Sequence, residues 1–455
     1  LHLSLRRQRQ MCIRDSSCSV RKWVINMASA ISAVLLLLTF VGFIYYIVKG
    51  GNLMIGFFVM AILWAVIGQI PADQVIQKVF AEPALNYGPT IIYIVFGSWF
   101  GRVLVDSGIA PAISEATNQV GKKRPLLAVF LVIIVTAFIF VSAYGVGSVI
   151  AIGVILLPIM LSVGLPRDIA LSAFSMAIGA PMYLNVVLYN QIKAFFPKAE
   201  YGGTYLIFGV CATLVQLAAV MLFIFWNRKK IDPTKADENL KIIGAETQQV
   251  ADVKVPKLAF VVPIVPVLMN MLFKWDAIPA LTLATLLAML LTGKFKGYQK
   301  FVTFLNSTIK QAIGDIAGLI MFLMALIMFS GAASMDAVRF RPLFEAVLPH
   351  NMLILALAFG VLAPLALFRG PFHVWGAGAA TAAVLSGIGL FPDEFLLPLL
   401  YVPTLLAVST DITQSWNVWG LDYMKVQTRD FLKHGVPIMW VVSIINELLV
   451  YVFFG

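Results

Sequence analysis

Two side chains that could handle an ion lie in one short apolar stretch. The stretch 367–378 reads LFRGPFHVWGAG and contains Arg369 and His373. Arginine holds a carboxylate through two parallel hydrogen bonds, and histidine can carry a proton near neutral pH. These residue types predict an organic-anion site in which Gly370 and His373 lie beside Arg369. Two alternatives remain open: a cytoplasmic turn that merely places a positive charge at Arg369, and a structural hydrogen bond for His373.

The same stretch predicts a helix break, and a second break lies about 225 positions earlier. The Gly-Pro pair interrupts the first stretch, and residues 141–148 read VSAYGVGS. Interrupted segments at matching places in two halves point to a transporter's binding site. A helix that starts at such a break presents free N–H groups and partial positive charge to an anion. We therefore predict further substrate contacts at Tyr144, Gly145, Gly147, Ser148 and Gly376.

Polar residues also follow prolines in two other apolar segments. Asn185 follows Pro181, and Ser409, Thr410 and Asp411 follow Pro403, with Thr410 lying 225 positions after Asn185. Ionisable side chains inside membrane segments are rare and usually functional. Asp411 is therefore the leading cation or proton site, with Ser409 and His373 beside it, and Asn185 and Thr410 are predicted to contact substrate. The alternative places Asp411 at the inner interface as a helix-end charge. Glu447 ranks lower, because its helix matches a peripheral segment.

The composition indicates an all-α polytopic membrane protein. The chain is 60% hydrophobic and 12% charged, with a mean hydropathy of +0.92, whereas soluble domains are about 25% charged. The net charge of +11 lies largely in short loops, so it indicates orientation in a lipid bilayer and not binding to nucleic acid. The three cysteines form no disulfide or metal pattern, and we expect no cofactor and no metal.

The apolar segments divide into two sets of seven. Glycines and segment starts repeat at a near-constant offset, as in Ser107-Gly108 with Ser330-Gly331. We predict a first repeat at 27–226, a cytoplasmic linker at 227–257 and a second repeat at 258–455, with 12–14 spans of which some are broken or re-entrant. The fourteen segments are 29–48, 52–70, 89–106, 125–143, 149–164, 168–190, 203–226, 258–274, 277–293, 313–330, 350–368, 372–390, 395–413 and 435–454.

An odd number of spans in each set predicts that the two repeats are inverted in the membrane. The loop charges agree with this orientation. Arg228-Lys229-Lys230 and Lys122-Lys123-Arg124 mark inside loops, whereas loops 71–88 and 331–349 fall outside. Residues 1–16 resemble the translated read-through of a sequencing adapter, with the match at Arg6–Ser16. We take 1–26 as a leader foreign to the protein and Met27 as the expected start.

Three motifs resemble gluconate permease-like and citrate-type carriers of the ion transporter superfamily. They are Gly97–Gly108, the run from Tyr144–Ser148 to Pro158, and Arg369 followed by Gly376–Ala382. The resemblance implies a carrier of organic anions. The chain departs from it by offering Tyr144 and Ser148 where an acidic or amide residue is expected, and by the bulky insert Gly370–Trp375.

Together these features predict a secondary active transporter in the inner membrane of a prokaryote. It would couple protons or sodium to symport of a small organic anion, either a gluconate-like sugar acid or a hydroxy-, di- or tricarboxylate, by alternating access. The alternative is a sodium/proton antiporter of the same superfamily that uses Asp411 and Asp106. A membrane-embedded enzyme or a channel is disfavoured, because no nucleophile–base pair and no filter-like repeat is visible. A homodimer stays open.

Overall fold

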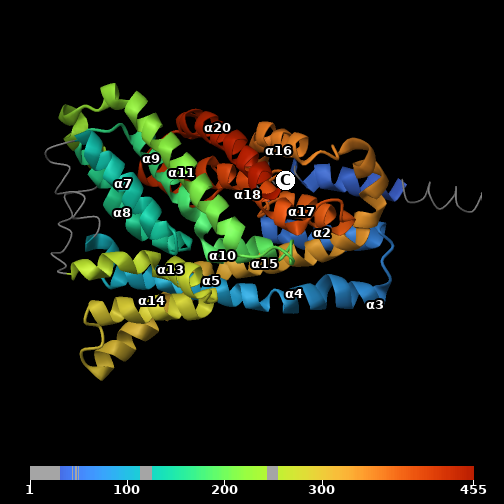
Figure 1. Ribbon diagram of the computed structural model, residues 1–455, viewed down its shortest axis with the longest axis horizontal. Coiled ribbons are helices and arrows are strands. Elements are labelled where there is room, and N and C mark those ends of the chain that lie inside the picture. Colours follow the sequence, from blue (N-terminus) through green and yellow to red (C-terminus); the bar gives the residue numbers. More distant parts are fainter. Residues whose placement is uncertain (1–30, 44, 47–48, 50, 113–124, 243–254) are drawn as a thin grey trace, which may run out of the picture.

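The computed structural model describes residues 31–43, 45–46, 49, 51–112, 125–242 and 255–455, and all regular elements in these ranges are helices (Figure 1). The predicted all-α class is confirmed for this part of the chain. The proposed leader 1–26, the basic loop Lys122–Arg124 and residues 243–254 of the proposed linker lie outside the described residues.

The first half of the chain forms helices that are interrupted at two places. A helix at Ile31–Phe43 precedes them. The breaks lie after α7 and at Asn185 after η2, where the chain leaves the helical path before the next helix begins. The helices are α2 (Leu53–Ile67), α5 (Gly88–Asp106), α7 (Pro125–Phe140), α8 (Val146–Ser162), α9 (Arg167–Gly179), the 3-10 helix η2 (Ala180–Leu184), α10 (Val186–Lys193) and α11 (Gly203–Trp226).

The second half of the chain also contains two breaks, one after η6 and one after α18. The helices are η5 (Lys257–Ile264), α13 (Val265–Phe273), α14 (Ala277–Leu291), α15 (Tyr298–Val347), α16 (Met352–Val361), the 3-10 helix η6 (Ala363–Arg369), α17 (Gly378–Ile388), α18 (Asp393–Thr410), α19 (Ser415–Tyr423) and α20 (Thr428–Phe454).

Several of these helices can cross a membrane. Among the described residues, five are long and apolar enough to do so, or up to seven if each of two bent helix pairs is one span. In lipid a spanning segment must satisfy its own backbone, which is why such apolar runs fold as helices. The chain is thus a polytopic α-helical membrane protein. Thirteen of the fourteen predicted segments overlap helices, and the first, 29–48, is described only in part, with a helix at Ile31–Phe43. The number of crossings stays a prediction.

Three predicted loops are instead helical. Residues 71–88 form α3 (Ala72–Gln74), the π-helix η1 (Val75–Ala81) and α4 (Glu82–Asn86), which continue into α5 as a rod of 35 residues. The predicted loops 294–310 and 331–349 belong largely to α15, a helix of 50 residues. A helix continues through polar residues until a breaker stops it, and no proline occurs between Tyr298 and Arg341. The apolar pattern marks the buried part of such a helix and not its ends.

The two halves interlock. Helix α2 packs against α15 of the other half, and α14 packs against α5. Figure 1 shows the α3–α5 rod lying along α15. Polar contacts join the two rods: the Trp99 indole N–H donates to the Thr308 hydroxyl at 3.1 Å, and the Ser98 hydroxyl donates to the Ala312 carbonyl at 3.1 Å. At the far side, α11 and α20 pack against each other and against α9.

The described start of the linker folds back on the first half. The Asp232 N–H donates to the Gly164 carbonyl at 2.9 Å, beyond the end of α8. The Asp232 carboxylate accepts hydrogen bonds from the hydroxyl and backbone N–H of Thr234 at 2.6 and 3.0 Å, which lower the pKa of Asp232. Helix α12 (Ala236–Ile242) then packs against α8.

Candidate functional site

A cavity of about 650 Å³ lies where all four helix breaks converge. The break after α7 contributes Tyr144 and Gly145, and the chain after the break at Asn185 places α10 with Gln191 on the wall. The second half contributes Arg369 and Trp375 from one break, and Gln414, Ser415 and Trp416 from the other. The remaining wall comes mainly from α15, with Asp315, Ile316, Gly318, Leu319, Met321 and Phe322.

The first break places Tyr144 and Gly145 at the cavity. Gly145 has φ +102°, a conformation that other residues adopt only with strain. The Ser148 hydroxyl donates to the Tyr144 carbonyl at 3.1 Å and packs toward Gly101 of α5. Gly147 lies in the first turn of α8. Of the four residues predicted here, Tyr144 and Gly145 line the cavity, whereas Ser148 supports the backbone behind it.

The break after η6 is a tight loop held by backbone hydrogen bonds. The Ala377 N–H donates to the Arg369 carbonyl at 2.7 Å, and the Gly378 N–H donates to the Gly370 carbonyl at 3.1 Å. A Cβ at Gly370 would lie 2.0 Å from the Leu365 carbonyl oxygen, and one at Gly376 would lie 2.4 Å from the Arg369 carbonyl oxygen. These glycines therefore admit neighbouring backbone and are not among the residues that line the cavity, and their contact with a ligand stays a prediction.

Arg369 itself occupies a strained position. Its φ is +60° and that of Phe368 is +56°, in a region that costs non-glycine residues about 1–3 kcal/mol each. Strain of this kind persists only where the surrounding structure enforces it. Here the Arg369 N–H donates to the Asp411 carboxylate at 3.3 Å. The backbone conformation directs a buried guanidinium, 9% exposed, to the wall of the cavity.

The guanidinium of Arg369 has neutral partners within the protein. Its Nη1 donates to the Trp375 carbonyl and its Nη2 donates to the Thr413 carbonyl, both at 3.3 Å, while Nη1 lies 3.4 Å from His373 Nε2. Among the described residues Arg369 forms no ion pair. A buried cation without an ion-pair partner is costly, so the guanidinium presents a positive charge at the cavity wall that suits an entering carboxylate.

Five buried polar atoms in the side chains that line the cavity have no hydrogen-bond partner within the described part of the chain. Four of them are donors: Gln191 Nε2, Arg369 Nε, Trp375 Nε1 and Trp416 Nε1. The fifth is Gln414 Oε1, an acceptor. Buried polar groups are almost always paired in folded proteins, so an unpaired set of mainly donors indicates a place where a ligand or water supplies acceptors.

Asp411 holds the break after η6 to the end of α18. One carboxylate oxygen accepts from the Arg369 N–H at 3.3 Å and the other accepts from the Thr413 N–H at 2.8 Å. The side chain is fully buried, and its carbonyl accepts from the Asn417 side-chain amide at 2.9 Å. Asp411 is not among the residues that line the cavity. Its contacts give it a positioning role, and its binding of a cation or proton stays a prediction.

Asn185 does the same work for the first break. Its Oδ1 accepts from the N–H groups of Val187 and Leu188, at 3.0 and 3.3 Å, and caps α10. Its Nδ2 donates to the carbonyls of Phe140 and Ala143, at 3.1 and 3.0 Å. Both the side-chain oxygen and the side-chain nitrogen of Asn185 are therefore occupied by backbone groups. Asn185 is buried behind the cavity and does not line it.

The remaining predicted residues also lie behind the wall. The Thr410 hydroxyl donates to the Leu406 carbonyl at 2.8 Å, and its methyl packs toward Gly435. The Ser409 hydroxyl accepts from the Gln216 amide at 3.2 Å. His373 Nδ1 accepts from the Trp375 N–H at 3.2 Å, so its other nitrogen carries the hydrogen when the ring is neutral. None of the three lines the cavity.

Sequence reasoning missed Asp315 and Trp416 and gave no role to Gln191. Asp315 is exposed to the cavity from α15. A charged residue inside an apolar segment is rare and could have indicated Asp315, but its position near the start of the predicted segment 313–330 is equally typical of a helix-end charge. Asp106, the second carboxylate of the antiporter alternative, is paired with Arg102 at 2.9 Å and does not line the cavity.

The fold and cavity define a class: a helical membrane protein whose broken helices converge on a pocket lined by apolar side chains and a few polar ones. No protein-family model matches the chain, and no curated protein matches it. Among solved structures, the chain is similar to the YdaH transporter of Alcanivorax borkumensis, described as having an unusual topology. The two are 12% identical, with a TM-score of 0.54 over 84% of this chain and 89% of that one. At this identity the likeness establishes a shared fold.

Proposed function

We propose that the protein is a secondary active transporter of a small organic anion. The observation that carries the proposal is the Arg369 guanidinium at the cavity wall, without an ion-pair partner among the described residues and with Nε unpaired. The fold neighbour is a transporter by its description. The substrate class is a gluconate-like sugar acid or a hydroxy-, di- or tricarboxylate, moved by proton- or sodium-coupled symport, in the inner membrane of a prokaryote.

The size and chemistry of the cavity support this substrate class. A volume of about 650 Å³ lies within the range of small-molecule sites. Arg369 supplies a forked donor for a carboxylate. Trp375 and Trp416 add neutral N–H donors, and Gln191 and Gln414 add amides suited to hydroxyl groups. A polyhydroxylated acid can use all of these groups, whereas a bare inorganic cation can use few of them.

Alternating access would rest on the 7+7 inverted repeat, and the helix pairings support such a repeat. Helix α2 begins at Leu53 and α14 at Ala277, while the rods begin at Ala72 and Tyr298, each pair about 225 positions apart. The contacts follow the same relation, since α2 packs on α15 as α14 packs on α5. Of the fourteen segments, those at the breaks would be re-entrant or broken, which gives 12–14 spans.

In this proposal the coupling ion binds beside the anion. Asp411, Ser409 and His373 are the coupling candidates at the site, because each is buried and lies within a few residues of the two second-half breaks. Movement that separates Arg369 from Asp411 would free the Asp411 carboxylate to accept a cation or proton. Coupled in this way, anion binding to Arg369 and ion binding to Asp411 would occur in the same conformation.

Uptake by proteoliposomes tests the proposal. Gluconate, lactate, succinate and citrate are offered in turn to the reconstituted protein, with a proton or a sodium gradient imposed. We expect gradient-driven accumulation of at least one carboxylate and loss of that uptake in Arg369→Ala. Arg102→Ala, which removes an arginine paired outside the cavity, serves as the matched control. Ion exchange without uptake of any carboxylate would support the antiporter and contradict the proposal.

A further inference from the structure

A buried acidic residue lies in a polar cluster outside the cavity. Glu447 is on α20, seven residues before its end at Phe454, about 10 Å along the helix axis. Ser443 and Asn446 share its face of α20, and all three side chains are buried. Gln216 of α11 lies nearby in the antiparallel α11–α20 pair, because Asn446 Nδ2 reaches the Ala212 carbonyl one turn away at 3.5 Å. None of these residues lines the cavity.

Glu447 is shielded from solvent and unpaired within the part of the chain that the structure describes. There its side chain is 0% exposed, and both carboxyl oxygens lack a hydrogen-bond partner. Oxygens of Ser443, Asn446 and Gln216 are unpartnered as well. Within the described residues no cation forms an ion pair with Glu447.

The elements around Glu447 supply no charge to balance it. Helix α16 presents Gly360, and a Cβ there would lie 3.3 Å from the Glu447 Cβ. From η2, Tyr183 faces it, with a neutral hydroxyl that accepts from Asn446 Nδ2 at 2.9 Å. From α18, Tyr401 packs on Tyr183. The nearest charged pair on α20, His434 with Asp168 of α9 at 3.0 Å, lies thirteen residues away, about 20 Å along the axis.

An ionised carboxylate could not persist in this setting. A buried charge without a counter-ion or hydrogen bonds is strongly unfavourable, and ionisable residues in membrane segments mark ion and proton pathways. We infer that Glu447 binds the proton that drives transport, holding it in the present conformation and releasing it when α20 moves against its neighbours. This inference rests on the proposed transport function, names the proton as the coupling ion, and places its binding site at Glu447 in place of the candidates beside the anion, Asp411, Ser409 and His373.

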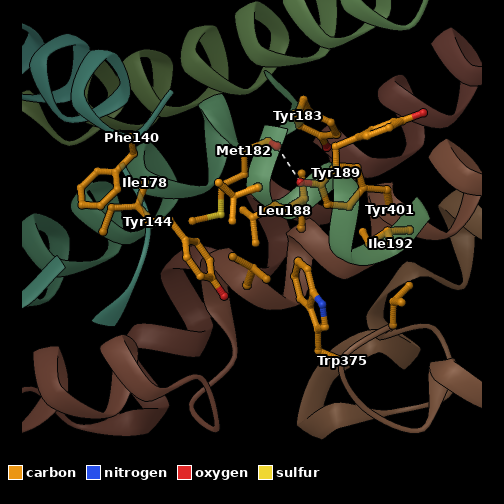
Figure 2. Close-up of a cluster of buried hydrophobic side chains, with 14 of the residues drawn as sticks. Phe140, Tyr144, Ile178, Met182, Tyr183, Leu188, Tyr189, Ile192, Trp375 and Tyr401 are labelled. Carbon is orange, nitrogen blue, oxygen red and sulfur yellow. Dashed lines mark hydrogen bonds between the residues drawn. The ribbon is translucent and has the colours of Figure 1, made fainter. Parts of the chain in front are cut away.

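A continuous set of contacts connects Glu447 with the cavity. Tyr183, which binds Asn446, packs edge-on against Tyr401 with ring centroids 5.9 Å apart, and Tyr401 packs edge-on against Trp375 at 6.5 Å. Figure 2 shows these rings together, with Trp375 pointing toward the same region as Tyr144. A second connection runs from Gln216 to Ser409, two residues before Asp411. Movement of Trp375 on anion binding can therefore reach the surroundings of Glu447.

The test separates proton coupling from substrate binding. Glutamine mimics a protonated carboxyl but cannot release a proton. In proteoliposomes, we expect Glu447→Gln to exchange labelled substrate for unlabelled substrate across the membrane, yet to lose accumulation under an inward proton gradient. Ser443→Ala, one turn away on the same face, is the matched control and should accumulate substrate as the parent protein does. Asp411→Asn is measured alongside.

The outcomes distinguish this inference from the proposed function. If the parent protein takes up no carboxylate, the proposed function fails. If the parent protein accumulates substrate and Glu447→Gln does so equally under a proton gradient, the inference is wrong and the proton or ion site lies elsewhere. An independent readout needs no transport: infrared difference spectra should contain the carbonyl stretch of a protonated carboxyl that disappears at high pH and is absent in Glu447→Gln. A spectrum unchanged by the substitution would also overturn the inference.

Discussion

Each half of the chain brings a pair of helix breaks to the cavity, and the two pairs are tied together alike but charged differently. In the first half, Asn185 ties the chain at Phe140 and Ala143 to the start of α10. In the second half, Asp411 ties Arg369 to the start of the α18–α19 turn. The first tie uses a neutral amide, whereas the second uses a carboxylate that accepts from the backbone N–H of Arg369, the residue whose guanidinium faces the cavity. The difference teaches that the scaffold is shared by both halves, while charge recognition is concentrated in the second.

The largest effect that sharpens this comparison is expected at Arg369. Replacement by alanine removes the forked, charged donor. We expect the rate of anion uptake at limiting substrate to fall roughly 30- to 150-fold, which corresponds to about 2–3 kcal/mol. Lysine keeps the charge but loses the fork, and we expect a loss of roughly tenfold. Initial uptake rates normalised to reconstituted protein measure both. Equal rates in the lysine and alanine variants would mean that forked recognition plays no part.

A smaller effect is expected on stability when the neutral tie is cut. Asn185→Ala leaves two carbonyls and two N–H groups of the first break without their side-chain partner, at a cost of about 2–4 kcal/mol. Asn190→Ala removes one hydrogen bond to the Val186 carbonyl on the same helix and should cost about 1 kcal/mol or less. Thermal unfolding in detergent measures the difference. Asp411→Asn keeps an acceptor oxygen and should be milder than Asn185→Ala; the opposite order would contradict the equivalence of the two ties.

The smallest effect is expected at Asp315, the acidic residue that faces the cavity from α15. Its negative charge opposes an anion, but its exposure to the cavity screens the interaction. Asp315→Asn should therefore improve apparent affinity for a carboxylate by roughly two- to fivefold, with the gain shrinking as salt is raised. Substrate dependence of uptake at two ionic strengths measures this. A loss of affinity would mean that Asp315 binds a positive group of the substrate or a coupling cation.

The architecture could largely be anticipated from the sequence. Apolar runs with few charges have one solution in a bilayer, so each of them is helical. The breaks at 141–148 and 367–378 were visible because glycine and proline interrupt helices for steric reasons. The ends of the rods were not visible: α15 continues through Lys300 and Lys310, since a charged residue does not stop a helix.

The cavity lining was harder to anticipate, for a physical reason. Broken backbone at membrane depth needs partners of its own, so polar residues near a break are used there first. The side chains of Asn185, Thr410 and Asp411 all form hydrogen bonds with backbone groups. The sequence shows that such residues lie near a break, but it does not reveal which of them bind backbone and which face the cavity. Arg369 and Tyr144 could be named because their long side chains reach beyond the backbone they belong to.

Equilibrium binding of an anion to the purified protein tests the central claim most directly. Calorimetric titration of gluconate, succinate and citrate into the parent protein, Arg369→Ala and Arg102→Ala compares the cavity arginine with one that is paired outside it. The account predicts that at least one carboxylate binds the parent protein and Arg102→Ala alike, and that this binding is lost in folded Arg369→Ala. Equal binding of that carboxylate by folded Arg369→Ala would contradict it.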